Sequence, residues 1–174
     1  MQTVRNDFFK LGDKFATVIG DDVKVGQQAP EFTSAAQNWA PVNPVAESKG
    51  KVAILSAVPS LDTEVCDRET RRFNEEAAKL GDDIIIWTIS TDFPFAQKRW
   101  CGAAGVDKVK VVSDVLEAEM GVKYGLLVKE CRYLRRAVFV VNREGKLTYV
   151  AYMEHNGLEP NYDEVINAAK EALR

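Results

Sequence analysis

The stretch Val52–Val58 (VAILSAV), followed by Pro59–Cys66 (PSLDTEVC) and Asp67–Leu80 (DRETRRFNEEAAKL), decides the fold and most of the chemistry. The first run is apolar and predicts a buried strand, whereas the amphipathic pattern predicts a helix over 64–80. Cys66 therefore lies in the first turn of a helix, just beyond the end of a strand. Unpaired N–H groups and the positive end of the helix dipole favour a thiolate there, and the thiolate is the nucleophilic form of cysteine. The pattern indicates a reactive cysteine.

Strands and helices alternate beyond this unit. We expect strands at 84–90, 109–112, 137–141 and 147–153, and helices at 94–103, 116–124 and 163–173. Apolar strands that alternate with helices predict an α/β fold with a mainly parallel central sheet flanked by helices, and the last two strands form an antiparallel hairpin. Reactive side chains in such sheets gather beyond the carboxyl ends of the strands, where the segments with Cys66 and Cys101 both begin.

The first fifty residues carry weaker signals. Short apolar runs at 14–19 and 23–25 flank Gly20-Asp21-Asp22 and predict a β-hairpin. We therefore assign residues 1–26 to an N-terminal hairpin extension and the whole chain, 1–174, to one domain. Residues 26–50 are rich in Gly, Pro, Asn and Gln and predict a loop with at most a short strand.

Composition excludes several classes of protein. A net charge of −3, with both signs interspersed, argues against nucleic acid or an anionic membrane as a partner. The N-terminus has no signal-peptide pattern and no apolar run is long enough to span a membrane, so we expect a cytoplasmic protein. The three cysteines contain no C-x-x-C pair, and His155 is the only histidine, so we expect no metal. Cys131 is expected to be a buried small hydrophobic residue.

Pro59–Cys66 resembles the Pro-x-x-x-Thr-x-x-Cys active-site segment of peroxiredoxins. In its fuller form, Pro-Ser-x-Asp-Thr-x-Val-Cys, it is similar to the thiol peroxidase subgroup, the atypical 2-Cys peroxiredoxins. Four further segments follow in the order of that subgroup: 71–77 (RRFNEEA), 92–102 (DFPFAQKRWCG), 136–141 (RAVFVV) and 159–162 (EPNY). The resemblance implies a thioredoxin-like fold, a homodimer, and no haem, flavin or other cofactor.

The resemblance also implies a role for each site residue. Cys66 would be the peroxidatic cysteine, oxidised by a hydroperoxide to a sulfenic acid, and Cys101 the resolving cysteine that forms an intramolecular disulfide with it. Arg136 would stabilise the thiolate and the peroxide. Thr63 is expected to cap the helix, and the resemblance implies that its hydroxyl would also contact the peroxide and that Pro59 would shield the sulfur from water.

Three carboxylates near Cys66 in sequence, those of Glu64, Asp67 and Glu69, oppose a thiolate, so the site needs a cation. Arg136 is the favoured candidate, and the adjacent Arg135 is its rival. Glu64 is expected to face solvent.

The predicted function is a thiol-dependent peroxidase that reduces hydrogen peroxide and alkyl or lipid hydroperoxides and is recycled by thioredoxin or a similar disulfide reductase. Two alternatives remain open at this point. One is a single-cysteine peroxidase in which an external thiol resolves Cys66. The other is a redox switch without catalytic activity.

Overall fold

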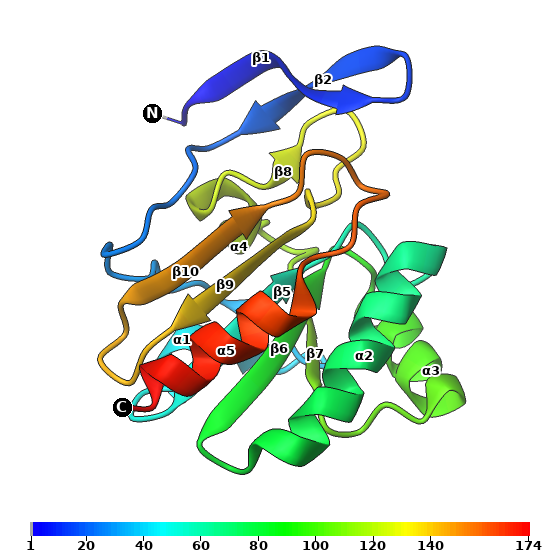
Figure 1. Cartoon of the computed structure of the whole chain (residues 1–174). Helices are drawn as coiled ribbons and strands as arrows, with labels where there is room; N and C mark the ends of the chain where they lie inside the picture. The colour runs from blue at the N-terminus through cyan, green and yellow to red at the C-terminus, as the bar shows by residue number, and fades with distance from the viewer. Residues whose placement is uncertain (1) are drawn as a thin grey trace.

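The computed structural model describes residues 2–174 (Figure 1). Its elements in chain order are β1 (Val4–Leu11), β2 (Lys14–Ile19), β3 (Ser34–Ala35), β4 (Pro41–Val42), α1 (Pro44–Glu47), β5 (Val52–Ala57), α2 (Glu64–Leu80), β6 (Ile84–Ser90), α3 (Pro94–Ala104), β7 (Lys110–Ser113), α4 (Glu119–Lys123), β8 (Leu127–Val128), β9 (Ala137–Val141), β10 (Leu147–Tyr152) and α5 (Tyr162–Ala172).

Seven strands form the central sheet in the order β10-β9-β5-β6-β7-β3-β4. The neighbours β5, β6 and β7 are parallel, and the other pairings are antiparallel, so the sheet is mixed with a parallel centre. Every residue of β5 and β9 is buried, which explains why these strands read as uninterrupted apolar runs. The predicted α/β architecture is confirmed.

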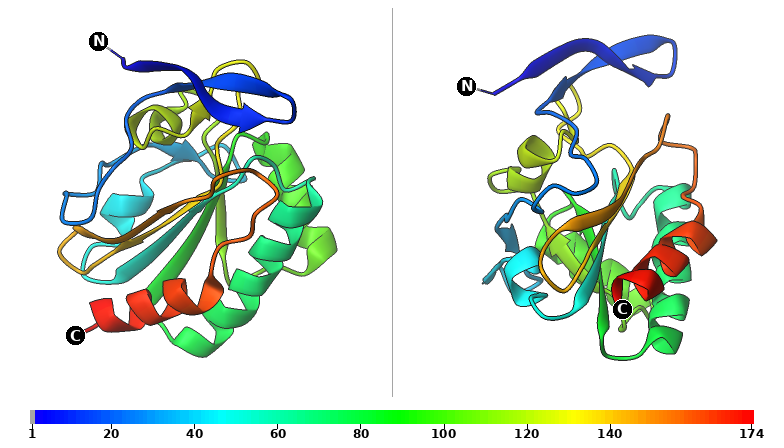
Figure 2. Two further views of the ribbon diagram at one scale, coloured as in Figure 1. Left: turned by 45° about the horizontal axis from the view of Figure 1, so that its top comes forward. Right: turned by 60° about the vertical axis from the view of Figure 1, so that its left-hand side comes forward.

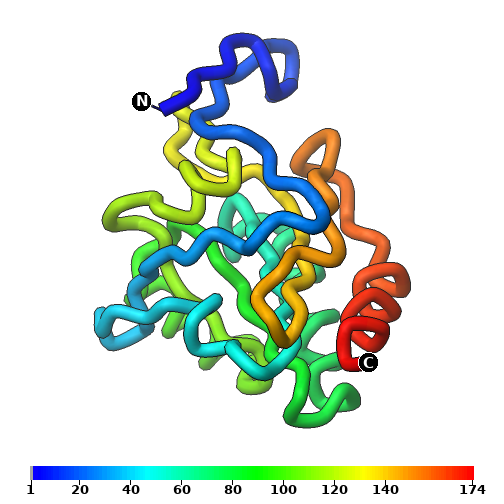
Figure 3. Tube along the Cα trace, turned by 90° about the vertical axis from the view of Figure 1, so that its left-hand side faces the viewer, coloured from blue at the N-terminus to red at the C-terminus, as the bar shows by residue number. Residues whose placement is uncertain are grey.

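Helices cover both faces of the sheet (Figures 1 and 2). Helices α2, α3 and α5 pack on one face, where Phe73 of α2 and Val165 of α5 belong to a single apolar cluster. Helices α1 and α4 contribute Val45 and Met120 to the cluster on the other face. Figure 3 shows residues 20–45 (blue to cyan) crossing in front of this second face.

The N-terminal hairpin is present, but its second strand is β1 and not the predicted strand at 23–25, which is absent. β1 pairs with β2 across the turn Gly12-Asp13, and β2 also pairs with β8. The chain after Gly20 leads from β2 towards the central sheet, where Val23 is buried and its N–H donates to the Tyr152 hydroxyl at 2.9 Å. Val23 is thus apolar because it packs into the core, although it does not belong to a strand.

Helix α4 is shorter than the predicted 116–124. Ala118 has a φ of +51°, which is not helical, so the helix begins only after it. The Asp114 carboxylate accepts the N–H groups of Met120 and Gly121 at 3.1 and 2.8 Å and thereby caps this late start.

The segment 26–50 has more structure than predicted. Besides the two-residue strands β3 and β4, it contains α1, whose first residue is Pro44. The Asn43 side chain caps this helix by accepting the Ala46 N–H at 3.0 Å.

Candidate active site

The turn between β5 and α2 positions Cys66. Pro59 is buried after the end of β5, and Thr63 is the N-cap of α2, as predicted. The Thr63 side-chain oxygen accepts the Cys66 N–H at 3.2 Å, and its hydroxyl donates to the Ser60 carbonyl oxygen at 3.1 Å. The cap fixes the first helical turn and with it the direction of the Cys66 side chain.

Arg136 lies directly beside the Cys66 sulfur. Its Nη2 donates to Cys66 Sγ at 3.1 Å, and the two residues are 1% and 0% exposed. The sheet register explains this contact, because Ala57 at the end of β5 pairs with Ala137 at the start of β9. Arg136 precedes Ala137 and so reaches the turn that follows β5.

Besides the Cys66 sulfur, two groups hold the Arg136 side chain in this position. Its Nη1 forms a buried ion pair with Glu69 Oε2 at 2.6 Å, and its Nη2 also donates to the Asn156 carbonyl oxygen at 3.0 Å. Ser56 of β5 donates to the other Glu69 oxygen at 2.7 Å. Because Glu69 is itself held by Ser56 and the Asn156 acceptor belongs to the backbone, the guanidinium has a fixed direction.

Burial alone would lower the pKa of the Arg136 guanidinium, but the charges of Glu69 and Cys66 outweigh this effect and raise it. The guanidinium therefore stays positively charged next to the sulfur.

The carboxylates expected to oppose a thiolate are each paired with a cation. The pairs are Glu64–Arg68 at 2.9 Å, Asp67–Arg71 at 2.8 Å and Glu69–Arg136 at 2.6 Å. Glu64 is exposed, as predicted. Glu69, which the sequence presented as unfavourable, instead holds the cation in place.

Arg135 points away from Cys66. Its Nη1 donates to Asp22 at 2.9 Å and to the Gly125 carbonyl oxygen at 3.0 Å, and its guanidinium lies 4.6 Å from the centre of the Tyr152 ring. The structure thus brings Arg136, and not its rival, to the sulfur.

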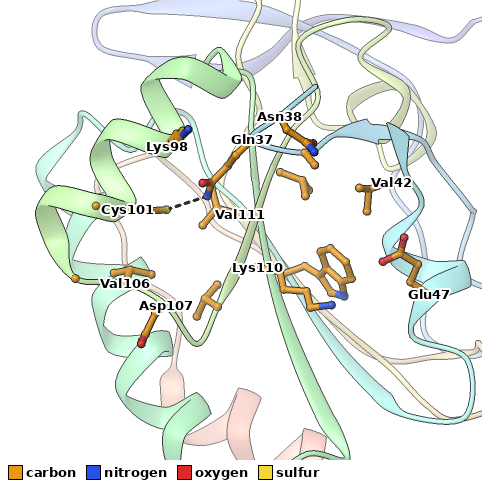
Figure 4. Close-up of a pocket in the computed structure, with 16 residues that line it drawn as sticks. Gln37, Asn38, Val42, Glu47, Lys98, Cys101, Val106, Asp107, Lys110 and Val111 are labelled. Carbon is orange, nitrogen blue, oxygen red and sulfur yellow. Dashed lines mark hydrogen bonds between the residues drawn. The ribbon is translucent and has the colours of Figure 1, made fainter. Parts of the chain in front are cut away.

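Cys101 lies near the end of α3 and is 8% exposed. Its Sγ accepts a hydrogen bond from Gln37 Nε2 at 3.6 Å. Both residues line a cavity of about 960 Å³ (Figure 4). Burial raises the pKa of the Cys101 thiol, so this cysteine is protonated at neutral pH. Cys66 and Cys101 are both free thiols in this structure.

The turn that carries Cys66 is also anchored to the segment that begins α3. The Asp92 carboxylate accepts the Ser60 hydroxyl at 2.7 Å, the Leu61 N–H at 2.8 Å and the Ser90 hydroxyl at 2.7 Å. One side chain therefore links the loops that precede the two cysteine helices.

Cys131 is exposed, so the expectation that it is buried was wrong. It lies in a turn after β8, in which the Arg132 N–H donates to the Val128 carbonyl oxygen at 2.8 Å. The turn directs this segment to the surface, away from both apolar faces of the sheet.

The aromatic residues near Cys101 differ in their surroundings. Phe93 and Phe95 are 60% and 71% exposed, and both rings pack against Trp39, with centroid distances of 6.5 and 5.3 Å. Trp100 is partly buried between α2 and α3. The two phenylalanines thus form a surface cluster with Trp39.

Ser56 and Asn156 were not identified from the sequence as part of the site, and Glu69 was identified only as a charge that opposes the thiolate, not as the partner of Arg136. That Glu69 has a buried partner could have been predicted, because Cys66, Glu69 and Phe73 follow the spacing of one buried helix face. An acidic residue on such a face requires a buried partner. Asn156 acts through its backbone carbonyl, which leaves no signal in the sequence.

Within residues 2–174, no cluster of three or more His, Cys, Asp or Glu side chains could hold a metal ion. In the same part of the chain, no helix is long and apolar enough to cross a membrane.

Comparison with known proteins gives a consistent family. Residues 24–166 match the Redoxin family. The chain is 50% identical to a thiol peroxidase of Bacillus subtilis over 91% of its own length and 93% of that protein. A peroxiredoxin-like protein from Aquifex aeolicus superposes with a TM-score of 0.85 at 37% identity, covering 97% of both chains. A thiol peroxidase from Chromobacterium violaceum has the same fold, with a TM-score of 0.80 at 18% identity over 95% of this chain and 96% of that one. The thioredoxin-like fold is thereby confirmed, and the chain belongs to the Redoxin family and, within it, to the thiol peroxidases, enzymes of the peroxiredoxin type.

Proposed function

We propose that this chain reduces hydrogen peroxide and alkyl or lipid hydroperoxides with Cys66 as the peroxidatic nucleophile. The observation that carries the proposal is the 3.1 Å contact between Arg136 Nη2 and Cys66 Sγ at a buried helix N-terminus. A fixed cation and a helix dipole both favour a thiolate, which is the reactive form of the cysteine.

In the first step, the Cys66 thiolate attacks the distal oxygen of the hydroperoxide. The O–O bond breaks, Cys66 becomes a sulfenic acid, and the released alkoxide or hydroxide takes up a proton. Arg136 stabilises the negative charge that develops on the peroxide oxygens. The Thr63 hydroxyl turns from Ser60 to a peroxide oxygen, and buried Pro59 keeps water from the sulfur.

In the second step, the Cys101 thiol attacks the sulfenic sulfur. An S–S bond forms between Cys66 and Cys101, and the sulfenic oxygen leaves as water with the thiol proton. The free Cys101 thiol in the neighbouring helix supports this role. Because the Cys66 sulfur is bound to Arg136 and the Cys101 sulfur to Gln37, we propose that at least one of the two helix ends unwinds before the disulfide forms.

A dithiol protein of the thioredoxin type then reduces the disulfide and is itself oxidised to a disulfide. We place the enzyme in the cytoplasm, where such reductants keep thiols reduced.

We also propose that the chain is one domain and forms a homodimer. The exposed rings of Phe93 and Phe95 support an association surface near the site.

A coupled assay with thioredoxin, thioredoxin reductase and NADPH tests the function. Cys66→Ser should abolish peroxide consumption, whereas Cys131→Ser, which removes an exposed thiol, should retain it. Cys101→Ser should complete one turnover, leave a trappable sulfenic acid, and lose thioredoxin-coupled activity. Full coupled activity in Cys101→Ser would favour the single-cysteine mechanism, and no turnover in the unmodified protein would favour the redox switch.

A further inference from the structure

A polar contact joins the two cysteine helices next to the cysteines themselves. Asp67 follows Cys66 in α2, and Trp100 precedes Cys101 in α3. Trp100 Nε1 donates to Asp67 Oδ1 at 2.9 Å. The contact therefore joins the first turn of α2 to the C-terminal part of α3, the two segments that carry the cysteines.

Arg71, one turn further along α2, reinforces this contact. Its Nε donates to the second Asp67 oxygen at 2.8 Å, its guanidinium lies 5.6 Å from the centre of the Trp100 ring, and its Nη1 donates to the Ala104 carbonyl oxygen at 3.4 Å. We refer to Asp67, Arg71 and Trp100 together as the α2–α3 tie.

We propose that the α2–α3 tie holds both cysteine segments in their helical form and thereby sets the rate of the step that joins Cys66 to Cys101. The inference rests on the proposed resolving role of Cys101. Asp67, Arg71 and Trp100 act as positioning residues, because the hydrogen bonds to the two sulfurs come from Arg136 and Gln37 and not from these side chains.

The geometry explains why the tie opposes the disulfide. Cys66 Sγ is bound to Arg136, and Cys101 Sγ is bound to Gln37. In the proposed resolving step, at least one of the two segments unwinds to bring the sulfurs together. Unwinding of the first turn of α2 displaces Asp67, and unwinding of the end of α3 displaces Trp100. The hydrogen bond is lost in either case, so it stabilises only the state in which both helices are intact.

The tie consequently influences the fate of the sulfenic acid on Cys66. One route is condensation with the Cys101 thiol, which forms the disulfide and releases water. The competing route is attack on a second hydroperoxide, which transfers an oxygen to give a sulfinic acid and releases an alcohol or water. A stronger tie prolongs the life of the sulfenic acid and favours the second route, whereas a weaker tie favours the disulfide.

Trp100→Phe is the direct test, because it retains an aromatic ring and removes the N–H donor. Trp87→Phe is the matched control. Trp87 lines the same cavity as Cys101, but its Nε1 donates to Ser48 Oγ at 2.9 Å, so this hydrogen bond does not join the two cysteine helices. Stopped-flow mixing with one equivalent of hydrogen peroxide separates Cys66 oxidation from disulfide formation. We expect Trp100→Phe to accelerate disulfide formation about fivefold with the oxidation step unchanged, as the loss of one hydrogen bond to a charged group allows. Trp87→Phe should alter neither step.

Two further measurements accompany the kinetics. At high peroxide, mass spectrometry should find less Cys66 sulfinic acid in Trp100→Phe than in the unmodified protein. In the reduced proteins, amide hydrogen exchange in 63–70 and 94–104 should be faster in Trp100→Phe than in Trp87→Phe. Arg71→Gln should reproduce both effects with the indole intact.

Equal disulfide rates in Trp100→Phe, Arg71→Gln and the unmodified protein would overturn the inference while leaving the proposed function intact. A slower disulfide step in these variants would also overturn it, since the tie would then assist the reaction. If the unmodified protein forms no Cys66–Cys101 disulfide, the resolving role of Cys101 fails and the inference fails with it.

Discussion

The contact of Arg136 with the Cys66 sulfur depends on the direction in which its side chain points as well as on its charge. The neighbouring Arg135 is also buried and also paired with a carboxylate, yet its guanidinium lies on the Asp22 side. Alternation along an extended chain sends adjacent side chains to opposite faces. The two adjacent arginines therefore lie in different surroundings, Arg136 at the sulfur and Arg135 beneath the N-terminal hairpin.

The first prediction compares these two arginines. Arg136→Met should slow the reaction of Cys66 with peroxide by about 10²–10³, the usual cost of removing one preorganised donor from developing charge. Arg135→Met should lower stability but change this rate by less than about tenfold. Single-turnover kinetics with hydrogen peroxide measure both rates. Similar losses in the two variants would contradict the assignment of Arg136.

The second prediction concerns Glu69, which holds Arg136 from the second turn of α2. Glu69→Gln keeps the size of the side chain and removes the charge that pairs with Arg136 Nη1 at 2.6 Å. We expect a loss of about tenfold in the peroxide step, because Arg136 remains present but is less firmly directed. Glu64→Gln removes an exposed carboxylate in the same helix and should have no effect on that rate.

The sequence predicted Thr63 as the N-cap of the helix that carries Cys66 and placed Cys101 in the next helix, and the structure confirms these positions. The residues alone left Arg135 and Arg136 open and only the family resemblance favoured Arg136, because the contact with Cys66 depends on how β9 pairs with β5. Glu69 was predicted to oppose the thiolate, whereas it pairs with Arg136, because the sequence shows its charge but not its partner.

At the scale of elements, local patterns predicted the parallel centre of the sheet and its helices to within about one residue. Strands β5, β6 and β9 are buried on both sides and are bounded by turns, so their apolar runs are unambiguous. The N-terminal hairpin and α4 were less predictable. Their limits depend on the tertiary contact of Val23 with Tyr152 and on the capping of α4 by Asp114.

The third prediction concerns this cap and is a pH dependence. Burial raises the pKa of the Asp114 carboxyl to about 6, although the N–H groups of Gly121 and Met120 act in the opposite direction. In the unfolded chain the same group has a pKa near 4, so between about pH 4 and 6 the folded state retains a proton that the unfolded state has lost. The free energy of unfolding should therefore fall as pH rises through this window, by up to roughly 3 kcal/mol.

Asp114→Asn isolates this contribution, because an amide keeps a cap acceptor but does not titrate. Urea unfolding of both proteins from pH 4 to 7 gives the difference between their stability curves. We expect the unmodified protein to lose stability relative to the variant between pH 4 and 6 and the difference to become constant above about pH 7. Parallel curves over the whole range would contradict the raised pKa.

At the scale of the whole molecule, the sheet brings together groups that are far apart in the sequence. Cys66 and Arg136 are separated by 70 residues, and the pairing of β5 with β9 makes them neighbours. Because β5 and β6 are parallel, α2 and α3 both begin at the carboxyl-end edge of the sheet. There Asp92, which precedes α3, accepts the Leu61 N–H of the turn that precedes α2. The site is therefore a consequence of sheet order, with each element supplying one or two groups.

The surface beside this edge carries the exposed rings of Phe93 and Phe95 around Trp39. Exposed apolar clusters of this kind are typical of interaction surfaces, and the proposed homodimer would cover the rings. Their position in the segment that leads into α3 means that an association surface here would adjoin the helix of Cys101.

The fourth prediction tests that surface. In sedimentation velocity, the reduced protein should have twice the mass of the 19.4 kDa chain. Phe95→Ser should shift the population towards monomer, because it removes a ring that is 71% exposed in the single chain. Phe15→Ser is the matched control, since that ring is 57% exposed in β2, on the N-terminal hairpin, and should leave the dimer intact. A monomeric unmodified protein would contradict the dimer itself, whereas a dimer that is insensitive to Phe95→Ser but sensitive to Phe15→Ser would move the interface to the hairpin.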